Sequence, residues 1–371
     1  MLIYVIKMTR VPPVPRHVPT HVPLVKTKTE TKSKTSKAKQ KQKQKAKPLN
    51  TYKMHVVSKY MLPIIGALLC TQSFHVEGAG VRGLSDPGAK LGVNLSTKQI
   101  AWDSPMKSAK EAVDRLDSIA NVFGVSHISR VKLFGYGKGE NALLFQELLG
   151  RSYIKDIMFT VSLHPTTTTI NRIAGYAQDH PDKTFHLAIG NEIGASQYAE
   201  ADSAIRDYYS QLVSSYSNIQ LTVPFAFNVI NGNSLPNTQA FKNLVNELNY
   251  FTINPYPFFQ DRSQEFNDYY TSTDCLNGYI DLVEQALTGI GMGHKEIVIG
   301  ETGWPSAGAE WDPQSWVSAA HSETAFRNAA EVIKTNTRVK AGYLFGLFDE
   351  AQKGSVEANF GILNGNGDRK W

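Results

Sequence analysis

The sequence predicts a single (β/α)8 barrel, and three features of the chain lead to this fold class. Short runs rich in apolar and β-branched residues recur from Leu91 onward. Polar or amphipathic stretches of helical length separate these runs. Eight such runs fit into about 280 residues, which is the strand number and domain size typical of a (β/α)8 barrel.

The predicted elements alternate regularly along the chain. The predicted strands are Leu91–Leu95, His127–Phe134, Ile157–Leu163, Phe185–Asn191, Ile219–Pro224, Tyr250–Pro255, Glu296–Thr302 and Ala341–Leu347. The predicted helices between them include Ser108–Phe123, Thr168–Asp179, Ala199–Tyr216, Thr238–Leu248, Asp274–Leu287 and Glu323–Lys334. A doubly wound open sheet is the alternative, but no G-x-G-x-x-G turn follows the first strand. No internal repeat beyond this alternation and no second domain are predicted.

Residues 1–53 form a basic extension rich in Pro and Lys. They contain twelve Lys, two Arg and one Glu, and residues 26–47 include almost no apolar side chain. Such a composition cannot bury enough surface to offset the entropy of ordering, so we expect this segment to be disordered. A solvated tail and a nucleic-acid-binding or targeting arm are its two interpretations. The rest of the chain has more acidic than basic residues, and for the protein as a whole no nucleic-acid partner is expected.

Residues 54–79 have the composition of a secretory signal. A short basic flank ends at Lys59, an apolar run covers Tyr60–Cys70, and small residues lie near Ala79. The apolar run is shorter than the roughly 20 residues that span a bilayer. We therefore predict secretion to the extracellular space or cell wall, with no membrane span in the mature form. A buried N-terminal helix is the alternative. Residues 80–371 then make up the barrel domain.

Cysteine content gives no indication of a disulfide or a metal site. Outside the signal-like segment the chain has one cysteine, Cys275, and no C-x-x-C pair. We expect no cofactor, no metal and a monomeric protein.

Two predicted strands end in a glutamate. The fourth runs from Phe185 into Gly-Asn191-Glu192, and the seventh runs from Glu296 into Gly-Glu301-Thr-Gly. The C-terminal ends of barrel strands form the mouth where active sites lie. Strands four and seven lie on roughly opposite sides of that mouth, so their carboxyl groups can face each other across a substrate.

A facing pair of carboxyl groups indicates glycoside hydrolysis. One protonated carboxyl donates to the leaving oxygen, and a second carboxylate attacks the anomeric carbon or activates water. Asn191 is placed to hydrogen-bond a sugar hydroxyl beside the reacting centre. Two glutamates alone are weak support for this chemistry, because most glutamates are solvated surface residues.

The stretch Ile297-Val-Ile-Gly-Glu301-Thr-Gly-Trp-Pro-Ser-Ala-Gly308 resembles the signature of family 17 glycoside hydrolases, the β-1,3-glucanases and their lichenase relatives. The resemblance spans roughly residues 91–371. It also rests on Gly92-Val93-Asn94, Ala188-Ile-Gly-Asn-Glu192, Asn254-Pro-Tyr256-Pro-Phe-Phe259, Tyr343-Leu-Phe-Gly-Leu-Phe-Asp-Glu350-Ala-Gln-Lys353, Glu357 and Phe360-Gly361.

This resemblance implies roles for individual residues. Glu192 corresponds to the acid/base and Glu301 to the nucleophile of a retaining enzyme, with a β-glucan polysaccharide or oligosaccharide as substrate. A carboxylate, an ammonium and a further acidic residue near the catalytic pair correspond to Glu350, Lys353 and Glu357, and Lys353 suits the nucleophile side. The aromatic candidates are Tyr256, which would reach the cleft, and three side chains that either offer faces to sugar rings or pack the barrel: Phe258, Phe259 and Trp304.

The chain departs from the family pattern at two strand ends. Leu95 stands where the family usually has Tyr, and Lys132-Leu-Phe134-Gly135 stands where it usually has Arg-apolar-Tyr-Asp. Both positions lie at the mouth, so the subsites for non-reacting sugars are expected to differ.

The sequence therefore predicts a retaining, endo-acting β-1,3-glucanase. A non-catalytic wall-binding protein is one alternative, although the catalytic carboxylates are both present. A transglycosylase would use the same residues. The choice between β-1,3 and mixed β-1,3/1,4 linkages, and between endo and exo cleavage, stays open.

Overall fold

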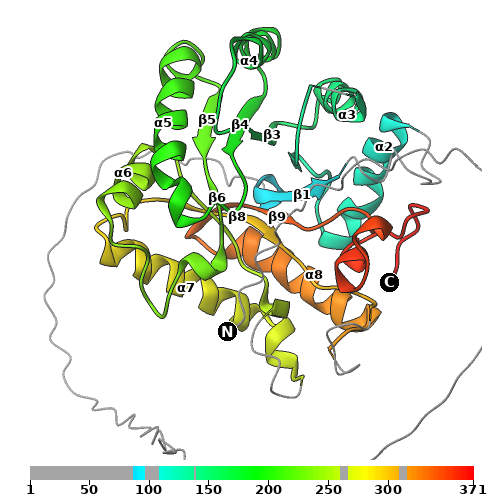
Figure 1. The fold of residues 1–371 in the computed structure, drawn as a ribbon. Helices are drawn as coiled ribbons and strands as arrows, with labels where there is room; N and C mark the ends of the chain where they lie inside the picture. The colour runs from blue at the N-terminus through cyan, green and yellow to red at the C-terminus, as the bar shows by residue number, and fades with distance from the viewer. Residues whose placement is uncertain (1–86, 97–107, 138, 260–265, 309–315) are drawn as a thin grey trace, which may run out of the picture. The chain divides into compact units, whose positions relative to one another are not determined.

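The computed structural model describes residues 87–96, 108–137, 139–259, 266–308 and 316–371 (Figure 1). The predicted extension (1–53) and signal segment (54–79) lie outside these residues. Within the described ranges, no helix is both long and apolar enough to cross a membrane.

The described strands form one parallel sheet that curves into a barrel. Their order is β5-β4-β3-β2-β1-β9-β8-β7-β6, so the first and last strands of the chain, β1 and β9, pair with each other. The strand bounds are β1 Leu91–Leu95, β2 Arg130–Leu133, β3 Asp156–Val161, β4 Thr184–Ile189, β5 Ile219–Thr222, β6 Pro224–Ala226, β7 Phe251–Asn254, β8 Ile297–Thr302 and β9 Val339–Leu344.

The two edges of this sheet, β5 and β6, are successive parts of one stretch of chain. β5 pairs with β4, whereas β6 pairs with β7, and the change falls at Val223. Pro224 has no amide hydrogen, so the ladder cannot continue unbroken through it. Bonds across this seam include Asn249 N to Leu221 O at 3.0 Å and Leu221 N to Asn249 Oδ1 at 2.6 Å.

β5 and β6 together occupy one position of the barrel, which leaves eight positions and confirms the (β/α)8 prediction. The predicted fifth strand, Ile219–Pro224, is corrected to two shorter strands that extend to Ala226.

Helices surround the strands in Figure 1. Their bounds are α2 Ala109–Ala120, α3 Gly139–Leu149, α4 Thr167–Asp179, α5 Tyr198–Tyr208, α6 Gln239–Glu247, α7 Thr273–Gly289 and α8 Ala319–Thr335. Side-chain hydroxyl groups cap the N-termini of five of them, from Ser108, Thr166, Thr238, Ser272 and Ser318.

The helix α3 was not among the predicted ranges. Its apolar residues do not keep to one face, and Leu143 is exposed. The predicted helix Ala199–Tyr216 is α5 followed by a π-helical turn, Tyr209–Val213.

Successive strand residues face alternately toward the helices and toward the barrel interior. On β3, Ile157 and Phe159 pack into the large core shared with the helices, whereas Met158 belongs to a separate interior cluster with Tyr250 and Tyr343. A Cβ on Gly92 would lie 2.6 Å from the Tyr343 ring, so this interior position requires glycine.

A buried polar network lies near the N-terminal ends of the strands. His186 on β4 contacts Tyr250 Oη at 2.7 Å through Nδ1 and Asp156 Oδ1 at 2.8 Å through Nε2. Arg130 on β2 lies 3.1 Å from the same Asp156 oxygen. Burial lowers the pKa of His186, although Asp156 opposes this. Burial acts to raise the pKa of Asp156, but the bond from His186 and the charge of Arg130 outweigh it and lower that pKa.

This network predicts acid sensitivity of the fold. The folded-state pKa of His186 lies below its ordinary value of 6.5, so the unfolded chain binds a proton first as the pH falls. Stability is fully present above that value and is lost below it, by up to about 1.4 kcal/mol per pH unit for one proton. Urea unfolding between pH 8 and roughly pH 4 measures the slope. His186→Gln should flatten it near pH 6; an unchanged slope would contradict this origin.

Candidate active site

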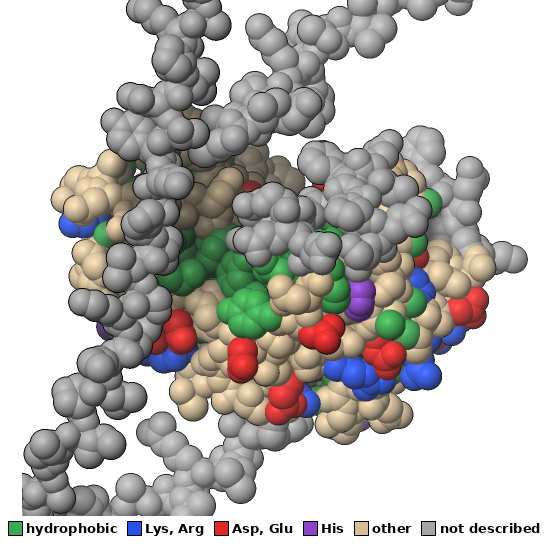
Figure 2. Space-filling view, turned by 90° about the horizontal axis from the view of Figure 1, so that it is seen from below, with side chains coloured by type: hydrophobic (Ala, Val, Ile, Leu, Met, Phe, Trp, Pro, Cys, Tyr) green, Lys and Arg blue, Asp and Glu red, His purple; other side chains and the backbone are tan. Residues whose placement is uncertain are grey.

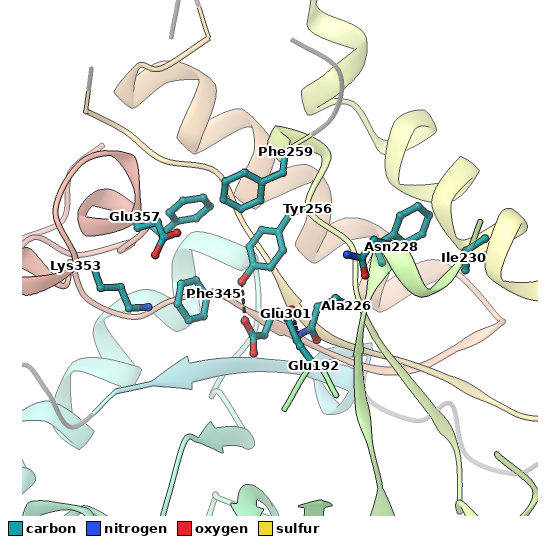
Figure 3. Close-up of a pocket in the computed structure, with 13 residues that line it drawn as sticks. Glu192, Ala226, Asn228, Ile230, Tyr256, Phe259, Glu301, Phe345, Lys353 and Glu357 are labelled. Atoms are coloured by element: carbon teal, nitrogen blue, oxygen red, sulfur yellow. Dashed lines mark hydrogen bonds between the residues drawn. The ribbon is translucent and has the colours of Figure 1, made fainter. Parts of the chain in front are cut away.

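Glu192 stands in a tight turn just after β4. Gly190 has φ +67° and Glu192 itself has φ +51°, a conformation that costs a non-glycine residue about 1 kcal/mol or more. The Glu192 amide donates to Pro224 O, at the start of β6, at 2.9 Å. This bond fixes the turn against the barrel seam and brings the Glu192 carboxyl into the cleft (Figure 3).

The Glu192 carboxyl has an amide donor in the cleft. Asn254, buried at the end of β7, donates from Nδ2 to Glu192 Oε1 at 2.9 Å. The surrounding protein raises the pKa of Glu192 by disfavouring its charge, the Asn254 bond opposes this, and the charge of Glu301 raises the pKa further. Glu192 is still open to solvent through the mouth of the cleft. We expect a bound substrate to cover it and strengthen the upward shift.

Glu301 is buried, in contrast to Glu192. It lies within β8, its side chain is 8% exposed, and both carboxylate oxygens have donors. Lys132 Nζ lies 2.7 Å from Oε1, and Tyr256 Oη donates to Oε2 at 2.9 Å. A Cβ on the preceding residue, Gly300, would lie 2.4 Å from Asn254 Oδ1, so glycine there makes room for the Asn254 side chain.

Lys132 and Tyr256 are the two partners of this carboxylate, one for each oxygen. The Lys132 side chain is completely buried, and its ammonium also donates to Gly300 O at 3.3 Å. Burial and the neighbouring Glu301 charge raise the pKa of Tyr256 well above its ordinary value, which keeps the phenol protonated as a donor.

Both glutamates line one cavity of about 680 Å³ at the mouth of the barrel (Figure 3). The side chains around it come from the ends of β6, β7 and β8 and from the segments that follow β4, β6, β7 and β9. The lining residues are Glu192, Ala226, Phe227, Asn228, Ile230, Asn254, Tyr256, Phe259, Glu301, Phe345, Lys353, Glu357 and Phe360.

The residues predicted to support the catalytic pair lie on one side of this cavity. Lys353 and Glu357 line it, and Glu350 is buried behind Lys353 in an ion pair with it. Lys353 Nζ also lies 4.6 Å from the centre of the Phe345 ring. Lys353 was expected near Glu301, the candidate nucleophile. Lys132 makes this contact instead, from β2 and from the side of that strand that faces the barrel interior.

The aromatic candidates divide into two groups. Tyr256 and Phe259 line the cleft, and Phe259 is 46% exposed. Phe258 and Trp304 are buried in a cluster with Trp316, and the Trp304 indole donates to Trp316 O at 2.8 Å. For Phe258 and Trp304 the structure favours barrel packing over sugar contact.

Asn191 and Asn254 differ from the expectation. Asn191 is exposed and is not among the residues that line the cavity, whereas Asn254 contacts the candidate acid. Asn254 belongs to the motif Asn254–Phe259, but the motif alone does not predict its contact with Glu192. Lys132 is one of the departures from the family pattern. A lysine between the apolar residues of a barrel strand indicates a charge inside the barrel.

Among the described residues, no group of three or more His, Cys, Asp and Glu side chains is arranged to hold a metal ion. The cavity is lined by the carboxyl groups of Glu192, Glu301 and Glu357, by Lys353, and by amide and aromatic side chains. A (β/α)8 barrel with two carboxyl groups in one cleft at its strand ends is the arrangement of a glycoside hydrolase.

The chain belongs to the BtgE/BtgC glycoside hydrolase domain family, whose model matches residues 92–361. The expected resemblance to the β-1,3-glucanases is also confirmed. Glucan endo-1,3-beta-glucosidase GV of Hordeum vulgare is 25% identical over 215 residues, covering 48% of this chain and 66% of that protein. The acidic isoform GI9 of the same enzyme from Nicotiana tabacum is 25% identical over 297 residues, covering 66% and 82%.

Solved structures share the fold. CJP38, a β-1,3-glucanase and allergen of Cryptomeria japonica pollen, superposes with a TM-score of 0.59 at 21% identity, covering 76% of this chain and 98% of that one. An endo-laminarinase from Formosa has a TM-score of 0.59 at 15% identity, covering 75% and 84%.

Because Lys132 and Glu301 form a buried ion pair, we expect the effects of their substitutions on folding stability to be strongly coupled. Lys132→Met leaves a buried carboxylate without its cation and should destabilise the fold by about 3 to 5 kcal/mol. Lys132→Arg keeps the charge and should cost less. Adding Glu301→Gln to Lys132→Met removes the unpaired charge and should restore part of the loss, as measured by denaturant unfolding. Simple additivity of the two single changes would contradict the coupling.

Proposed function

We propose that the protein is a retaining endo-β-1,3-glucanase in which Glu192 is the acid/base and Glu301 the nucleophile. The observation that carries this proposal is the contrast between two carboxyl groups in one cavity. Glu192 has a raised pKa and one amide donor, which suits a proton donor. Glu301 is buried between an ammonium and a phenol, which suits a fixed anion.

The proposed reaction has two steps. Glu301 attacks the anomeric carbon while Glu192 protonates the leaving glycosidic oxygen, giving a glycosyl ester on Glu301. Glu192, now ionised, takes a proton from water, which attacks the same carbon and releases Glu301. The two carboxyl groups of such a pair are expected to lie about 5 to 5.5 Å apart.

During the first step, charge leaves the Glu301 oxygen that forms the ester. Lys132 and Tyr256 fix the orientation of the Glu301 carboxylate before the substrate reacts, so the side chain needs little reorganisation when the ester bond forms. The upward shift in the pKa of Glu192 favours its protonated form, which is the form that donates to the leaving oxygen.

A neutral β-glucan suits the cleft as substrate. Phe259 offers an exposed ring and Asn228 an amide, the two kinds of group that bind sugar faces and hydroxyls. On the face shown in Figure 2, acidic and basic side chains lie next to each other, as expected for a protein that binds a neutral polymer rather than a polyanion. The relatives named glucan endo-1,3-beta-glucosidases support the linkage and the endo mode. We propose a secreted monomer, from the signal-like residues 54–79 and the single barrel domain.

Product analysis tests this function. The purified full-length protein is incubated with laminarin, mixed-linkage β-glucan and cellulose, and the products are separated and identified. Short oligosaccharides from laminarin alone are expected. Products longer than a defined laminari-oligosaccharide substrate would instead show transfer to a sugar, and binding without any new product would show a wall-binding protein.

Variants of the two glutamates separate their roles. Glu301→Ala should lose turnover, and added azide should restore it with inversion at the anomeric carbon, because the small anion enters the space of the nucleophile. Glu192→Ala should still react with an aryl glycoside whose leaving group needs no proton. The anomeric configuration of the azide product by NMR is the deciding measurement. If azide instead gave the inverted product with Glu192→Ala and the retained product with Glu301→Ala, the two assignments would have to be exchanged.

The pH profile tests the contact between Asn254 and Glu192. The amide bond stabilises ionised Glu192, so Asn254→Ala should raise the pKa of the acid further. Because the acid must be protonated, the alkaline limb of kcat/KM should then move to higher pH. Asn218→Ala, which removes an amide bonded to backbone carbonyls near Lys183, is the matched control and should leave the limb in place. A limb that moves to lower pH in Asn254→Ala would refute the assignment.

A further inference from the structure

One buried lysine that the proposed reaction does not use lies behind the cleft. Lys370 follows a short turn in which Leu363 forms an antiparallel bridge with Arg369. The next residue, Trp371, lies against helix α8, with its ring 5.8 Å from the Arg327 guanidinium. These contacts return the chain to the barrel and aim the Lys370 side chain inward, where it is 11% exposed.

The Lys370 ammonium joins three separate segments. It lies 2.6 Å from Ser306 Oγ in the segment after β8, 2.7 Å from Asp349 Oδ1 in the segment after β9, and 2.9 Å from Asn359 O. An ammonium has three protons, so these contacts use its full donor capacity. Asp349 Oδ1 also accepts from the Gly361 amide at 2.9 Å.

Two of those segments belong to one wall of the cleft. We call residues 345–361 the β9 wall. It contributes Phe345, Lys353, Glu357 and Phe360 to the cavity lining. Bonds within the wall include Gly346 N to Phe360 O at 3.1 Å and Glu350 N to Ala358 O at 2.9 Å, which hold it as a closed loop.

Two backbone bonds tie the wall to β8 and the segment that follows it: one from Phe345 N to Thr302 O at 2.7 Å, where the wall begins, and one near its other end, at Ser306. Ser306, five residues after Glu301, donates from its amide to Asn359 O at 3.0 Å. The Lys370 ammonium lies at this junction and contacts both of these residues. Without it, the Asp349 carboxylate would lose its cation and the junction would lose charge-assisted bonds.

We propose that Lys370 is a positioning residue that fastens the β9 wall to the segment after β8 and so sets how tightly the cleft binds glucan. The inference rests on the proposed function for its substrate. Lys370 touches neither glutamate: Glu192 and Glu301 are held by Asn254, Lys132 and Tyr256. Loss of Lys370 therefore changes the wall and leaves the reacting pair in place.

Three variants of the full-length protein test this role. Lys370→Met removes the ammonium, and Lys370→Arg keeps a positive charge. Lys183→Met is the matched control: the Lys183 side chain is buried and donates to Arg151 O and Ile154 O, both at 2.9 Å, just before β4 and away from the mouth. Asp349→Asn weakens the same junction, and it replaces Lys370→Met in the test if Lys370→Met does not fold.

Steady-state kinetics on a laminari-oligosaccharide are measured for each variant. We expect Lys370→Met and Asp349→Asn to raise KM by about tenfold, with kcat changed much less, because wall contacts bind the substrate in ground state and transition state alike. Lys370→Arg should recover most of the affinity. Lys183→Met should lower the thermal midpoint and leave KM unchanged. An unaltered KM in Lys370→Met, or an equal rise in Lys183→Met, would overturn the proposal.

Amide hydrogen exchange separates this inference from the proposed function. Lys370→Met should speed exchange in residues 345–361 by tenfold or so relative to the wild type, and Lys183→Met should not. If the wild-type protein has no activity on β-1,3-glucan, the proposed function fails, and exchange alone then decides whether Lys370 holds the wall. Unchanged exchange in the wall would refute the fastening itself.

Discussion

A carboxylate buried at the end of a barrel strand has to be compensated where it lies, and Glu301 meets this requirement through two other parts of the barrel. Lys132 comes from β2 and Tyr256 follows β7, so the charge of one side chain fixes the relation between three positions of the sheet. An uncompensated charge at such a depth would cost several kcal/mol. A single constraint therefore fixes both the register of these strands and the position of Glu301, the proposed nucleophile.

The same arrangement explains why two chemically identical side chains differ. Glu192 enters the cleft from a turn beyond β4, open to solvent and beside one amide. Glu301 lies within β8 and has donors on both oxygens. A carboxyl group at the open rim can exchange protons with a sugar and with water, whereas one enclosed by donors is held in a fixed orientation. The barrel produces this asymmetry by ending β4 before its glutamate and extending β8 through its own.

The sequence was sufficient for the fold and for placing Glu192 and Glu301 in one cleft, because both depend on local patterns. Strand periodicity gave all eight barrel positions, and β1 was predicted with its observed bounds. The helix α3 was missed because its apolar residues are spread around its axis. Contacts across the barrel could not be predicted: Lys132 and Glu301 are separated by 169 positions in the sequence. Trp304 stood in the strongest motif, but its burial against Trp316 depends on a neighbour that no pattern connected to it.

The seam at Val223 gives the barrel an uneven response to heat. Elsewhere every strand is paired with both of its neighbours, with register shifts between β8 and β9, but β5 and β6 are joined to each other only by the chain and by a few bonds to the following segment. The Glu192 amide is bonded to Pro224 at this seam. Thermal fluctuations that widen the barrel there affect Glu192, the proposed acid, before they affect the core. Loss of the arrangement of the cleft on warming should therefore begin as a local event at this junction, while most of the sheet is still intact.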